Sequence, residues 1–370
     1  MEARRCSKTP FSLGSPGDGR PGPPRRGGRA SFVAAILLLS ATAAVRAQAP
    51  EIRHGEVVPR DVREMYDRGL QYLATTQKED GTWPSSGTEE GPASVGLGLM
   101  AFLASGEDPN YGLYSNHVRR ALRSIVTAQD ASTGIIGPSM YHHGFATLAL
   151  AEAYGAVDER NLWPGGKAPR SIGQALELAV RAAITSQKKN SFGAWRYSPD
   201  STDADTSVSG AVLVGLLAAR NAGIEVPDEA IDRAIAYYTS MTSSGGQVGY
   251  SGGMGGFGES TARSSIAALV YALARRKDLP AFKATREYLA RNLEQVEPSY
   301  PEYTRYYQAQ ALFQADFAAW EKWNKRLVRQ LKQAQQPDGS FRGQFGAAFN
   351  TSMSLLALAL NYRFLPIYER

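Results

Sequence analysis

Residues 187–219 read QKKNSFGAWRYSPDSTDADTSVSGAVLVGLLAA, and the organisation of the whole chain can be worked out from this stretch. Gln187 ends a segment whose apolar residues recur at helical spacing, a turn with a glycine and Trp195 follows, and an apolar segment begins after Asp205. Apolar residues on one helical face favour a half-exposed helix, whereas a segment that is apolar on most faces favours a buried one. The stretch therefore predicts an outer helix, a turn and an inner helix.

The same unit occurs six times along the chain, and its helix-end glutamines recur about 40 to 58 residues apart. Repeats of this length indicate a solenoid or a closed ring, because one helical hairpin cannot bury its apolar face alone. No segment alternates apolar and polar residues between hairpin turns, so we expect no sheet core. The twelve predicted helices are residues 62–77 and 92–104, 115–129 and 142–155, 168–187 and 208–219, 228–241 and 261–275, 281–295 and 305–315, and 318–335 and 349–362.

The turns share a glutamine, a glycine and an aromatic residue. In QKEDGTW, Gln77 precedes Gly81 by four residues and Trp83 follows two residues later. The glycine can adopt the left-handed conformation that ends a helix, the glutamine amide can bond backbone groups of the turn, and the aromatic ring covers both. We therefore predict a structural role for this set. Its other members are Gln187, Trp195, Gln335, Gly339 and Phe341, and glutamines stand at the same place in the repeat at Gln129 and Gln295.

Residues 1–47 have the pattern of a secretory signal peptide. A region rich in Arg, Gly and Pro precedes the apolar run SFVAAILLLSATAAV, and small residues follow it. This order is typical of cleaved leaders, and the run is shorter than the ~20 residues that a membrane span needs. An uncleaved N-terminal anchor is the alternative. We expect an exported protein, periplasmic or extracellular, with residues 48–60 as a linker, residues 61–370 as one helical domain and no stable membrane span after cleavage.

Charge and cysteine content exclude several functions. The chain has a formal net charge of +6, but residues 1–47 hold eight of its 41 Lys and Arg and two of its 35 Asp and Glu, which leaves 33 side chains of each sign. A domain without excess positive charge lacks the electrostatic footprint of a nucleic-acid-binding protein. The one cysteine, Cys6, lies in the predicted leader, so we expect no disulfide, thiolate nucleophile or thiolate metal ligand in the mature domain. We expect neither a metal nor a cofactor.

The turns also carry a family resemblance. QKEDGTW, QKKNSFGAW and QQPDGSF are similar to the QW repeats of the squalene cyclase and protein prenyltransferase superfamily. The resemblance covers about residues 60–370 and implies an all-α fold, the α6/α6 toroid with an inner and an outer ring, which agrees with six hairpins. More narrowly, MYHHGFATLALAEAYG, GAWRYSPDSTDADTSVSG, YYQAQAL and RFLPIYER resemble exported bacterial prenyltransferase/squalene-oxidase-repeat proteins, often from planctomycetes. Protein prenyltransferases bind zinc through Asp, Cys and His, a set that a domain without cysteine cannot supply.

Asp203 and Asp205 stand where squalene-hopene cyclase and its class II relatives carry an Asp-x-Asp-Asp motif, whose middle Asp protonates an alkene or epoxide. By this resemblance Asp205 is a candidate proton donor, with Asp203 beside it. Thr206 replaces the last Asp, which alters the coupling that tunes such an acid. An ion pair with Arg196 would lower the pKa of either aspartate and so disable an alkene-protonating acid. Two other interpretations stay open for Asp205, a cap on the helix that follows and a contact to a ligand.

In the toroid, further polar and aromatic residues are expected at the starts of the inner helices. His143 could approach Asp205 and orient it, and a histidine held by structural hydrogen bonds is the alternative. His142 and His143 are not expected to bind one metal ion, because adjacent helical residues point about 100° apart. Tyrosines at such positions could stack on a ligand or stabilise a cation. The candidate ligand-binding residues are Arg196, Tyr197, Glu259, Arg263, Arg305, Tyr306 and Tyr307.

Two functions fit these residues. In the first, the toroid binds a hydrophobic, isoprenoid-like small molecule or a partner protein in its central cavity, without full class II cyclase chemistry. In the second, it is a class II-like terpene cyclase or isomerase with Asp205 as proton donor. The missing last Asp and the predicted export favour the first function.

Overall fold

The computed structural model describes residues 58–84, 91–166, 168–251, 260–295 and 297–369. The chain's own contacts divide it into two units, Met1–Gly55 and Glu56–Arg370, and all described residues belong to the second. The predicted leader and most of the predicted linker lie outside the described residues. The described part is helical, with three isolated β-bridges and no strand.

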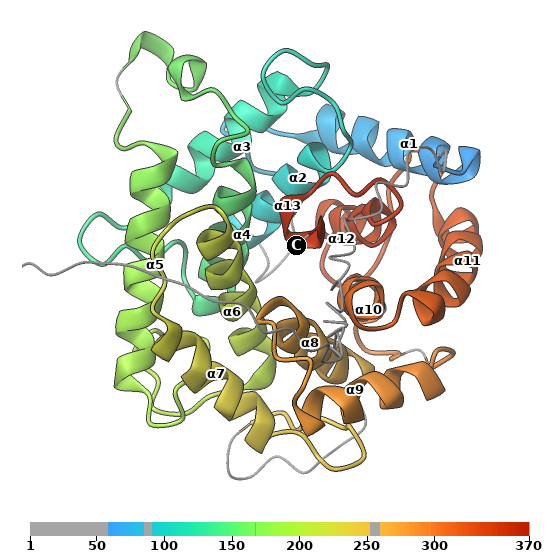
Figure 1. Cartoon of the computed structure of the whole chain (residues 1–370). Coiled ribbons are helices and arrows are strands. Elements are labelled where there is room, and N and C mark those ends of the chain that lie inside the picture. The colour runs from blue at the N-terminus through green and yellow to red at the C-terminus, as the bar shows by residue number, and fades with distance from the viewer. Residues whose placement is uncertain (1–57, 85–90, 167, 252–259, 296, 370) are drawn as a thin grey trace, which may run out of the picture. The chain divides into compact units, whose positions relative to one another are not determined.

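Twelve long helices alternate between an outer and an inner ring, in the six hairpins that the repeat predicts (Figure 1). The outer helices are α1 (Arg60–Thr76), α3 (Ser115–Thr127), α5 (Ile172–Lys189), α7 (Asp228–Ser240), α9 (Pro280–Arg291) and α11 (Phe317–Ala334). The inner helices are α2 (Pro92–Leu103), α4 (Met140–Ala153), α6 (Thr206–Asn221), α8 (Thr261–Leu273), α10 (Pro301–Ala315) and α12 (Ala347–Ala359). Two 3-10 turns, η1 (Glu159–Asn161) and η2 (Pro164–Gly166), precede α5, and a short helix, α13 (Pro366–Glu369), follows α12.

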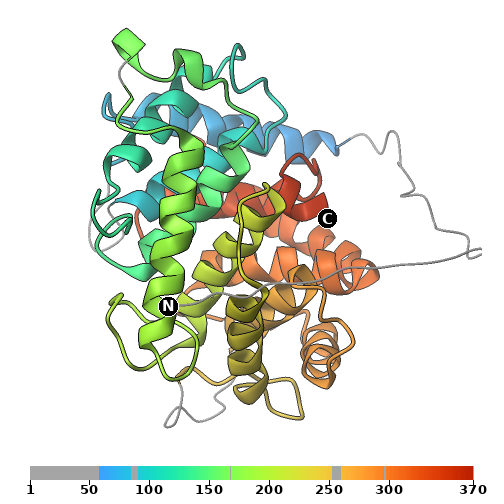
Figure 2. The same ribbon diagram turned by 60° about the vertical axis from the view of Figure 1, so that its left-hand side comes forward.

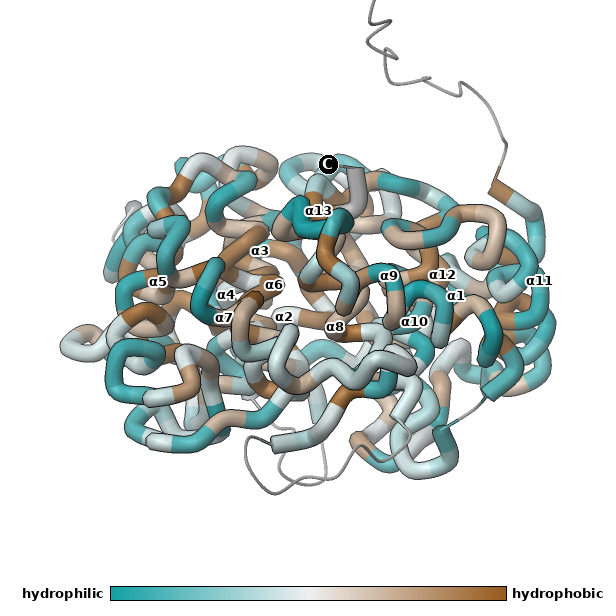
Figure 3. The backbone as a smooth tube through the Cα atoms, turned by 60° about the horizontal axis from the view of Figure 1, so that its bottom comes forward, coloured by the Kyte–Doolittle hydropathy of each residue, from teal (hydrophilic) through white to brown (hydrophobic). Residues whose placement is uncertain are grey.

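The inner ring forms the core of this unit. Its helices are buried on nearly every face, whereas the outer helices bury one face and expose polar residues on the other (Figure 3). Neighbouring inner helices pack closely, and a Cβ on Gly144 of α4 would lie only 2.6 Å from the carbonyl carbon of Ala211 in α6. The ring closes because α12 packs against both α10 and α2.

In four of the turns a glutamine joins its own hairpin to the next outer helix. The Nε2 of Gln77 donates to the carbonyl oxygen of Gly81 at 3.3 Å and to that of His117 in α3 at 3.1 Å. Gly81 has φ +85°, and a Cβ there would lie 2.2 Å from the carbonyl oxygen of Arg120 in α3. A left-handed residue without a side chain is therefore needed at this close approach. We call this arrangement a bridged turn.

Three further turns are bridged in the same way. The side chain of Gln187 donates to the carbonyl oxygens of Gly193 and of Ala230 in α7, at 2.7 and 2.8 Å. The other two bridges run from Gln129 to Gly134 and Ala175, and from Gln335 to Gly339 and Met65.

The glycine of the turn does not end the outer helix, contrary to the expectation from the sequence. Helix α1 ends at Thr76, and the backbone of Gln77 that follows it is already extended.

The aromatic residues of the bridged turns cover the end of the preceding outer helix. Trp83 and Trp195 each donate from Nε1 to a carbonyl oxygen of that helix, in Leu73 and Ala183, at 2.8 Å. Phe341 is buried without such a donor. Each indole N–H thus finds an acceptor in a helix carbonyl, which can accept two hydrogen bonds, while the ring is removed from water.

The turn between α9 and α10 is different. Helix α9 ends at Arg291, four residues before Gln295, and the turn contains no glycine. The Oε1 of Gln295 accepts a hydrogen bond from the hydroxyl of Tyr288 at 3.3 Å. This glutamine does not stand at a helix end as its spacing predicts. Helix α10 begins at Pro301, four residues earlier than predicted, with proline in the position that helix starts favour.

The C-terminal segment lies at the end of the ring where the inner helices finish, and α13 appears in the middle of the ring in Figure 1 and at one edge in Figure 2. The backbone N–H of Ile367 donates to the carboxylate of Glu152, next to the last residue of α4, at 3.4 Å. Leu365 and Ile367 are buried. Helix α4 has 14 residues, so this end lies about 20 Å from the starts of the inner helices.

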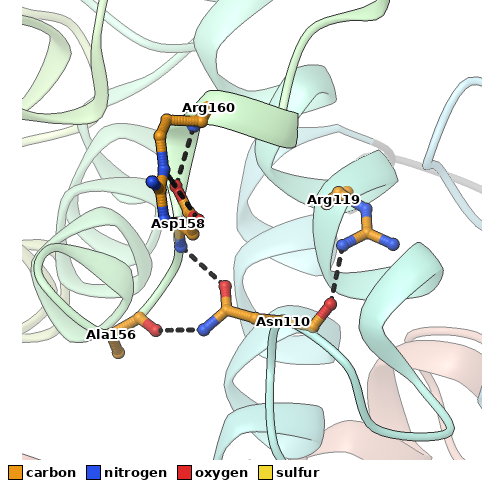
Figure 4. Close-up of polar contacts among 5 residues, drawn as sticks. All are labelled: Asn110, Arg119, Ala156, Asp158 and Arg160. Atoms are coloured by element: carbon orange, nitrogen blue, oxygen red, sulfur yellow. Dashed lines mark hydrogen bonds and ion pairs between the residues drawn. The ribbon is translucent and has the colours of Figure 1, made fainter.

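Asn110 ties two connections together at this same end (Figure 4). Its Nδ2 donates to the carbonyl oxygen of Ala156 at 3.0 Å, and its Oδ1 accepts from the backbone N–H of Asp158 at 2.6 Å. Its own carbonyl oxygen accepts from Arg119 at 3.0 Å. Hydrogen bonds from Arg160 lower the pKa of Asp158 to about 2. The α2–α3 and α4–α5 connections are thus held to each other by polar contacts, and the α4–α5 connection also by the burial of Val157 and Leu162.

Candidate functional site

Asp205 stands immediately before α6 and serves as its N-cap. Its Oδ1 accepts the backbone N–H of Val208 at 2.8 Å, and its own N–H donates to the carbonyl oxygen of Trp195 at 3.0 Å. The residue is fully buried, and Oδ2 has no hydrogen-bond partner among the described residues. Asp205 is therefore a helix cap with one oxygen, and it keeps a second, unpaired oxygen.

Burial raises the pKa of Asp205 to about 6, against the opposing effects of the Val208 amide and of the nearby Arg196 charge. Arg196 forms its ion pair with Asp203 instead, at 2.8 Å between Nη1 and Oδ2, and its guanidinium lies 5.9 Å from the ring centre of Tyr250. Arg196 therefore does not bring the pKa of Asp205 below its usual range. At pH 7 this carboxyl group is mostly ionised, and it becomes protonated under mildly acidic conditions.

Thr206, which stands in place of the last Asp of the cyclase motif, is a structural residue. Its Oγ1 donates to the carbonyl oxygen of Gly249 at 2.8 Å, and its backbone N–H donates to that of Tyr250 at 2.9 Å. The hydroxyl of Tyr238 donates to the carbonyl oxygen of Thr206. These bonds attach the start of α6 to the connection between α7 and α8, so Thr206 supplies no acidic partner for Asp205.

A group of aromatic side chains from α4 and α10 adjoins this carboxyl group, and we call it the aromatic cluster. Its ring centres lie 6.3 Å apart between Tyr141 and Tyr303, 4.9 Å between Tyr303 and Tyr307, and 4.8 Å between Tyr307 and Tyr306. Phe145 lies 6.1 Å from Tyr306. These distances are typical of packed aromatic pairs. The cluster consists of Tyr141, Phe145, Tyr303, Tyr306 and Tyr307.

The carboxylate of Asp205 also acts on the phenol groups around it. Burial is the main cause that raises the pKa of Tyr197, Tyr250 and Tyr303, and the negative charge of Asp205 raises it further in each. Tyr197 is 49% exposed, and its ring centre lies 6.5 Å from that of Tyr141. Tyr197 thus extends from the aromatic cluster toward the surface. Asp205, Tyr197, Tyr250 and the aromatic cluster together form what we call the Asp205 site.

His143 has a structural role. Its Nδ1 accepts the backbone N–H of Ile136 at 3.1 Å, and its Nε2 lies 3.0 Å from the carbonyl oxygen of Ala179. Burial lowers the pKa of this fully buried ring to about 4. Both ring nitrogens bond to backbone groups, so the alternative of a histidine held by structural hydrogen bonds describes His143, and neither nitrogen is left to orient Asp205. The Nδ1 of His142 accepts the backbone N–H of Ala93 at 3.3 Å.

The remaining predicted contact residues lie in different places. The Nε of Arg263 donates to the carbonyl oxygen of Val248 at 2.9 Å, and its charge opposes the burial that raises the pKa of Tyr250, so Arg263 lies at the edge of the Asp205 site. Arg305 lies in the second turn of α10 and lines a pocket formed with α11, away from the aromatic cluster. Glu259 lies outside the described residues. Sequence reasoning missed Tyr141 and Tyr303, although their spacing from Phe145 and from Tyr306 and Tyr307 marks a shared helical face.

The described residues contain no group of three or more His, Cys, Asp or Glu side chains placed to hold a metal ion. Within the same residues, no helix combines the length and the apolar character needed to cross a bilayer.

No model of a protein family matches the sequence, and no curated protein matches it significantly. Solved structures do share its fold, and they define the class as an α/α toroid. An inactive variant of the alpha-1,6-mannanase GH76A of Salegentibacter sp. HEL1_6, in complex with alpha-1,6-mannotriose, is similar with a TM-score of 0.62 and 8% identity, over 82% of this chain and 99% of that one.

Two further structures extend the comparison. A variant of the type II terpene cyclase MstE from Scytonema, in complex with its product merosterolic acid A, has a TM-score of 0.55 and 15% identity over 82% of this chain and 98% of that one. Rex8A from Paenibacillus barcinonensis, complexed with xylose, has a TM-score of 0.52 and 13% identity over 82% of this chain and 94% of that one.

The predicted α6/α6 toroid is confirmed. At such identities the likeness establishes the fold alone, and the chemistry has to be argued from the site.

Proposed function

We propose that this toroid binds an apolar, isoprenoid-like molecule with one hydrogen-bond donor at the Asp205 site, without class II cyclase chemistry. The observation that carries the proposal is the unpaired Oδ2 of a fully buried Asp205 beside the aromatic cluster. A buried carboxylate oxygen without a partner is costly, and a donor on a ligand would remove that cost. The aromatic side chains supply the apolar surface for the rest of such a molecule.

The acidity of Asp205 argues against cyclase chemistry. Protonation of an alkene needs a strong acid, and a pKa of about 6 makes this carboxyl group a weaker acid than an ordinary aspartic acid. A neighbouring carboxyl group does not assist it, since Thr206 bonds to backbone and Asp203 pairs with Arg196.

Glycoside hydrolysis, the other chemistry found on this fold, usually needs two carboxyl groups that flank one bond. Asp205 lies at the starts of the inner helices and Asp203 is engaged in its ion pair with Arg196. The other buried carboxyl group near the aromatic cluster, Glu152, lies near the opposite end of α4, so it and Asp205 do not flank one bond. Binding is therefore better supported than hydrolysis.

A class II-like isomerase remains the second candidate because of one observation. Below pH 6 the carboxyl group of Asp205 carries a proton, its Oδ2 has no partner among the described residues, and nearby aromatic ring faces could stabilise a cation.

The experiment compares geranylgeraniol with its methyl ether, which has the same apolar body but no donor. We expect the alcohol to bind at least about tenfold more tightly, as one hydrogen bond to a charged group allows. Asp205→Asn should reduce the difference in affinity between the alcohol and the ether, and Tyr307→Leu should weaken the binding of both ligands. Asp203→Asn is the matched control and should change neither affinity.

Mass spectrometry of the same mixtures separates the two candidates. Recovery of the alcohol unchanged supports binding. An isomerised product that forms with the wild-type protein and disappears with Asp205→Asn would refute binding without chemistry and establish the isomerase. Equal affinity for alcohol and ether would refute the role of Asp205 as acceptor.

A further inference from the structure

A second site lies on the outer wall, between the α9–α10 turn, the outward side of α10 and helix α11. A small pocket opens there, partly exposed to solvent. It occurs at the turn within the fifth hairpin, where α9 ends four residues before Gln295. The other five outer-to-inner turns each place a left-handed glycine against the next outer helix, and this turn has no glycine. The missing glycine explains why the space between this turn and α11 is left open.

The pocket contains a buried amide donor. Gln308 is 2% exposed, it lines the pocket, and its Nε2 has no hydrogen-bond partner among the described residues. A buried donor of this kind is costly to leave unpaired. The amide therefore indicates a ligand with an acceptor group.

Two guanidinium groups line the same pocket with only weak partners. Arg305 lies 3.8 Å from the carboxylate of Glu302, and Arg326 lies 3.4 Å from that of Glu294, whose side chain is 89% exposed. Both distances exceed the 2.7–2.9 Å that is typical of strong charge-assisted hydrogen bonds. Both arginines thus keep donors for a further anion, in addition to the buried Glu302 and the exposed Glu294.

A third carboxylate lies close to the pocket, and it is already occupied. Glu297 accepts hydrogen bonds from the hydroxyl of Ser260 and the backbone N–H of Ala262, at 3.0 and 3.2 Å, and so holds the start of α8. Its Oε2 also lies 3.5 Å from the hydroxyl of Thr304, a pocket residue. Its charge limits the pocket to a single small anion rather than a polyanion.

The remaining walls are apolar. Leu293, Trp323 and Leu327 line the pocket beside the three donors. We propose that the pocket binds a small organic carboxylate, whose oxygens accept from Arg305, Arg326 and Gln308 and whose apolar body lies against Trp323 and Leu327. This site is separate from the Asp205 site and does not depend on the function proposed for it.

The test uses benzoate, with benzamide as the neutral ligand of the same shape and inorganic phosphate as an anion without an apolar body. Binding is followed by the side-chain amide signals of Gln308 in NMR spectra, assigned by Gln308→Met. We expect benzoate to bind with a Kd of about 1 mM and the other two probes to bind at least about tenfold more weakly. Arg305→Gln and Arg326→Gln should each weaken benzoate about tenfold.

Arg329→Gln is the matched control, because Arg329 is an exposed residue of the same helix and does not line the pocket. It should leave benzoate binding unchanged, and circular dichroism of each variant checks that the fold is kept. Equal binding of benzamide or of phosphate would overturn the proposal. An Arg329→Gln variant that loses as much benzoate affinity as the Arg305 and Arg326 variants would also overturn it. The same holds if the Gln308 signals do not shift at about 10 mM benzoate.

Discussion

The α5–α6 turn and the α9–α10 turn stand at the same place in the repeat and differ in one device. In the first, Gln187 bonds its own turn and α7, and a left-handed glycine fits against that helix. In the second, the glutamine lies four residues past the helix end, no glycine is present, and a pocket opens toward α11. The difference shows that a glycine packed against the next outer helix closes the outer wall, as Gly246 does at the α7–α8 turn without a helix-end glutamine. The absence of this glycine at the α9–α10 turn leaves the pocket open.

The largest effect is expected from Gly81→Ala. The new Cβ would lie 2.2 Å from the carbonyl oxygen of Arg120, at a backbone φ of +85°. We expect the free energy of unfolding to fall by about 4 kcal/mol, the sum of a left-handed penalty and a steric clash with backbone. Urea unfolding measures it. Gly155→Ala is the control, since Gly155 has φ +80° with nothing within 4 Å, and it should cost only about 1 kcal/mol.

A somewhat smaller effect is expected when a bridge is removed. Gln187→Leu leaves the carbonyl oxygens of Gly193 and Ala230 without their side-chain donor, which we expect to cost about 3 kcal/mol. Gln295→Leu, at the unbridged turn, should cost less than about 1 kcal/mol. Equal losses in the two variants, by the same unfolding assay, would contradict the distinction between bridged and unbridged turns.

Asp205 should make stability fall as pH rises. Its pKa is raised to about 6 in the folded protein, so its protonated form stabilises the fold fully below pH 3.8, and this contribution is lost as pH rises through 6. Between pH 4 and 7 we expect wild type to lose about 2 kcal/mol relative to Asp205→Asn. The pKa of Asp158 is lowered, so its contribution to the free energy of unfolding is lost as pH falls below 4. Because both proteins contain Asp158, this contribution cancels when wild type is compared with Asp205→Asn. Parallel pH profiles of the two proteins would argue against the raised pKa.

The smallest effect is expected from Asp203→Asn. Its ion pair with Arg196 is half exposed, with side chains 53% and 30% accessible, so the free energy of unfolding should change by less than about 1 kcal/mol. The pKa of Asp205 should change little, because burial is its main cause. A drop as large as that of Gln187→Leu would mean that the outer aspartate also belongs to the buried site.

Periodicity predicted the twelve helices to within a few residues, because an outer helix must be amphipathic and an inner one apolar. It placed the start of α10 too late, although Pro301 is itself a helix-start signal. The short α13 carries no periodic pattern, since its position depends on burying Leu365 and Ile367 against distant inner helices.

The site was only partly predictable. Position alone indicated that Asp205 could be a cap, an acid or a ligand contact, and the structure shows a cap whose other oxygen is unpaired. The backbone partners of His143 come from residues 7 and 36 positions away, which no local pattern reveals. The pocket beside Gln308 forms because the α9–α10 turn lacks the glycine that the other turns have. A prediction based on the features that the repeats share therefore does not find this pocket.

The central claim is that Asp205 holds a buried carboxyl group with one unpaired oxygen, and its titration tests this most directly. Carbon-13 NMR of the Asp205 carboxyl carbon, assigned by Asp205→Asn, measures the pKa in the folded protein. We expect a midpoint at about pH 6. A midpoint at or below about pH 4, the ordinary range of an aspartate, would mean that both oxygens are solvated or paired and would contradict the proposed site.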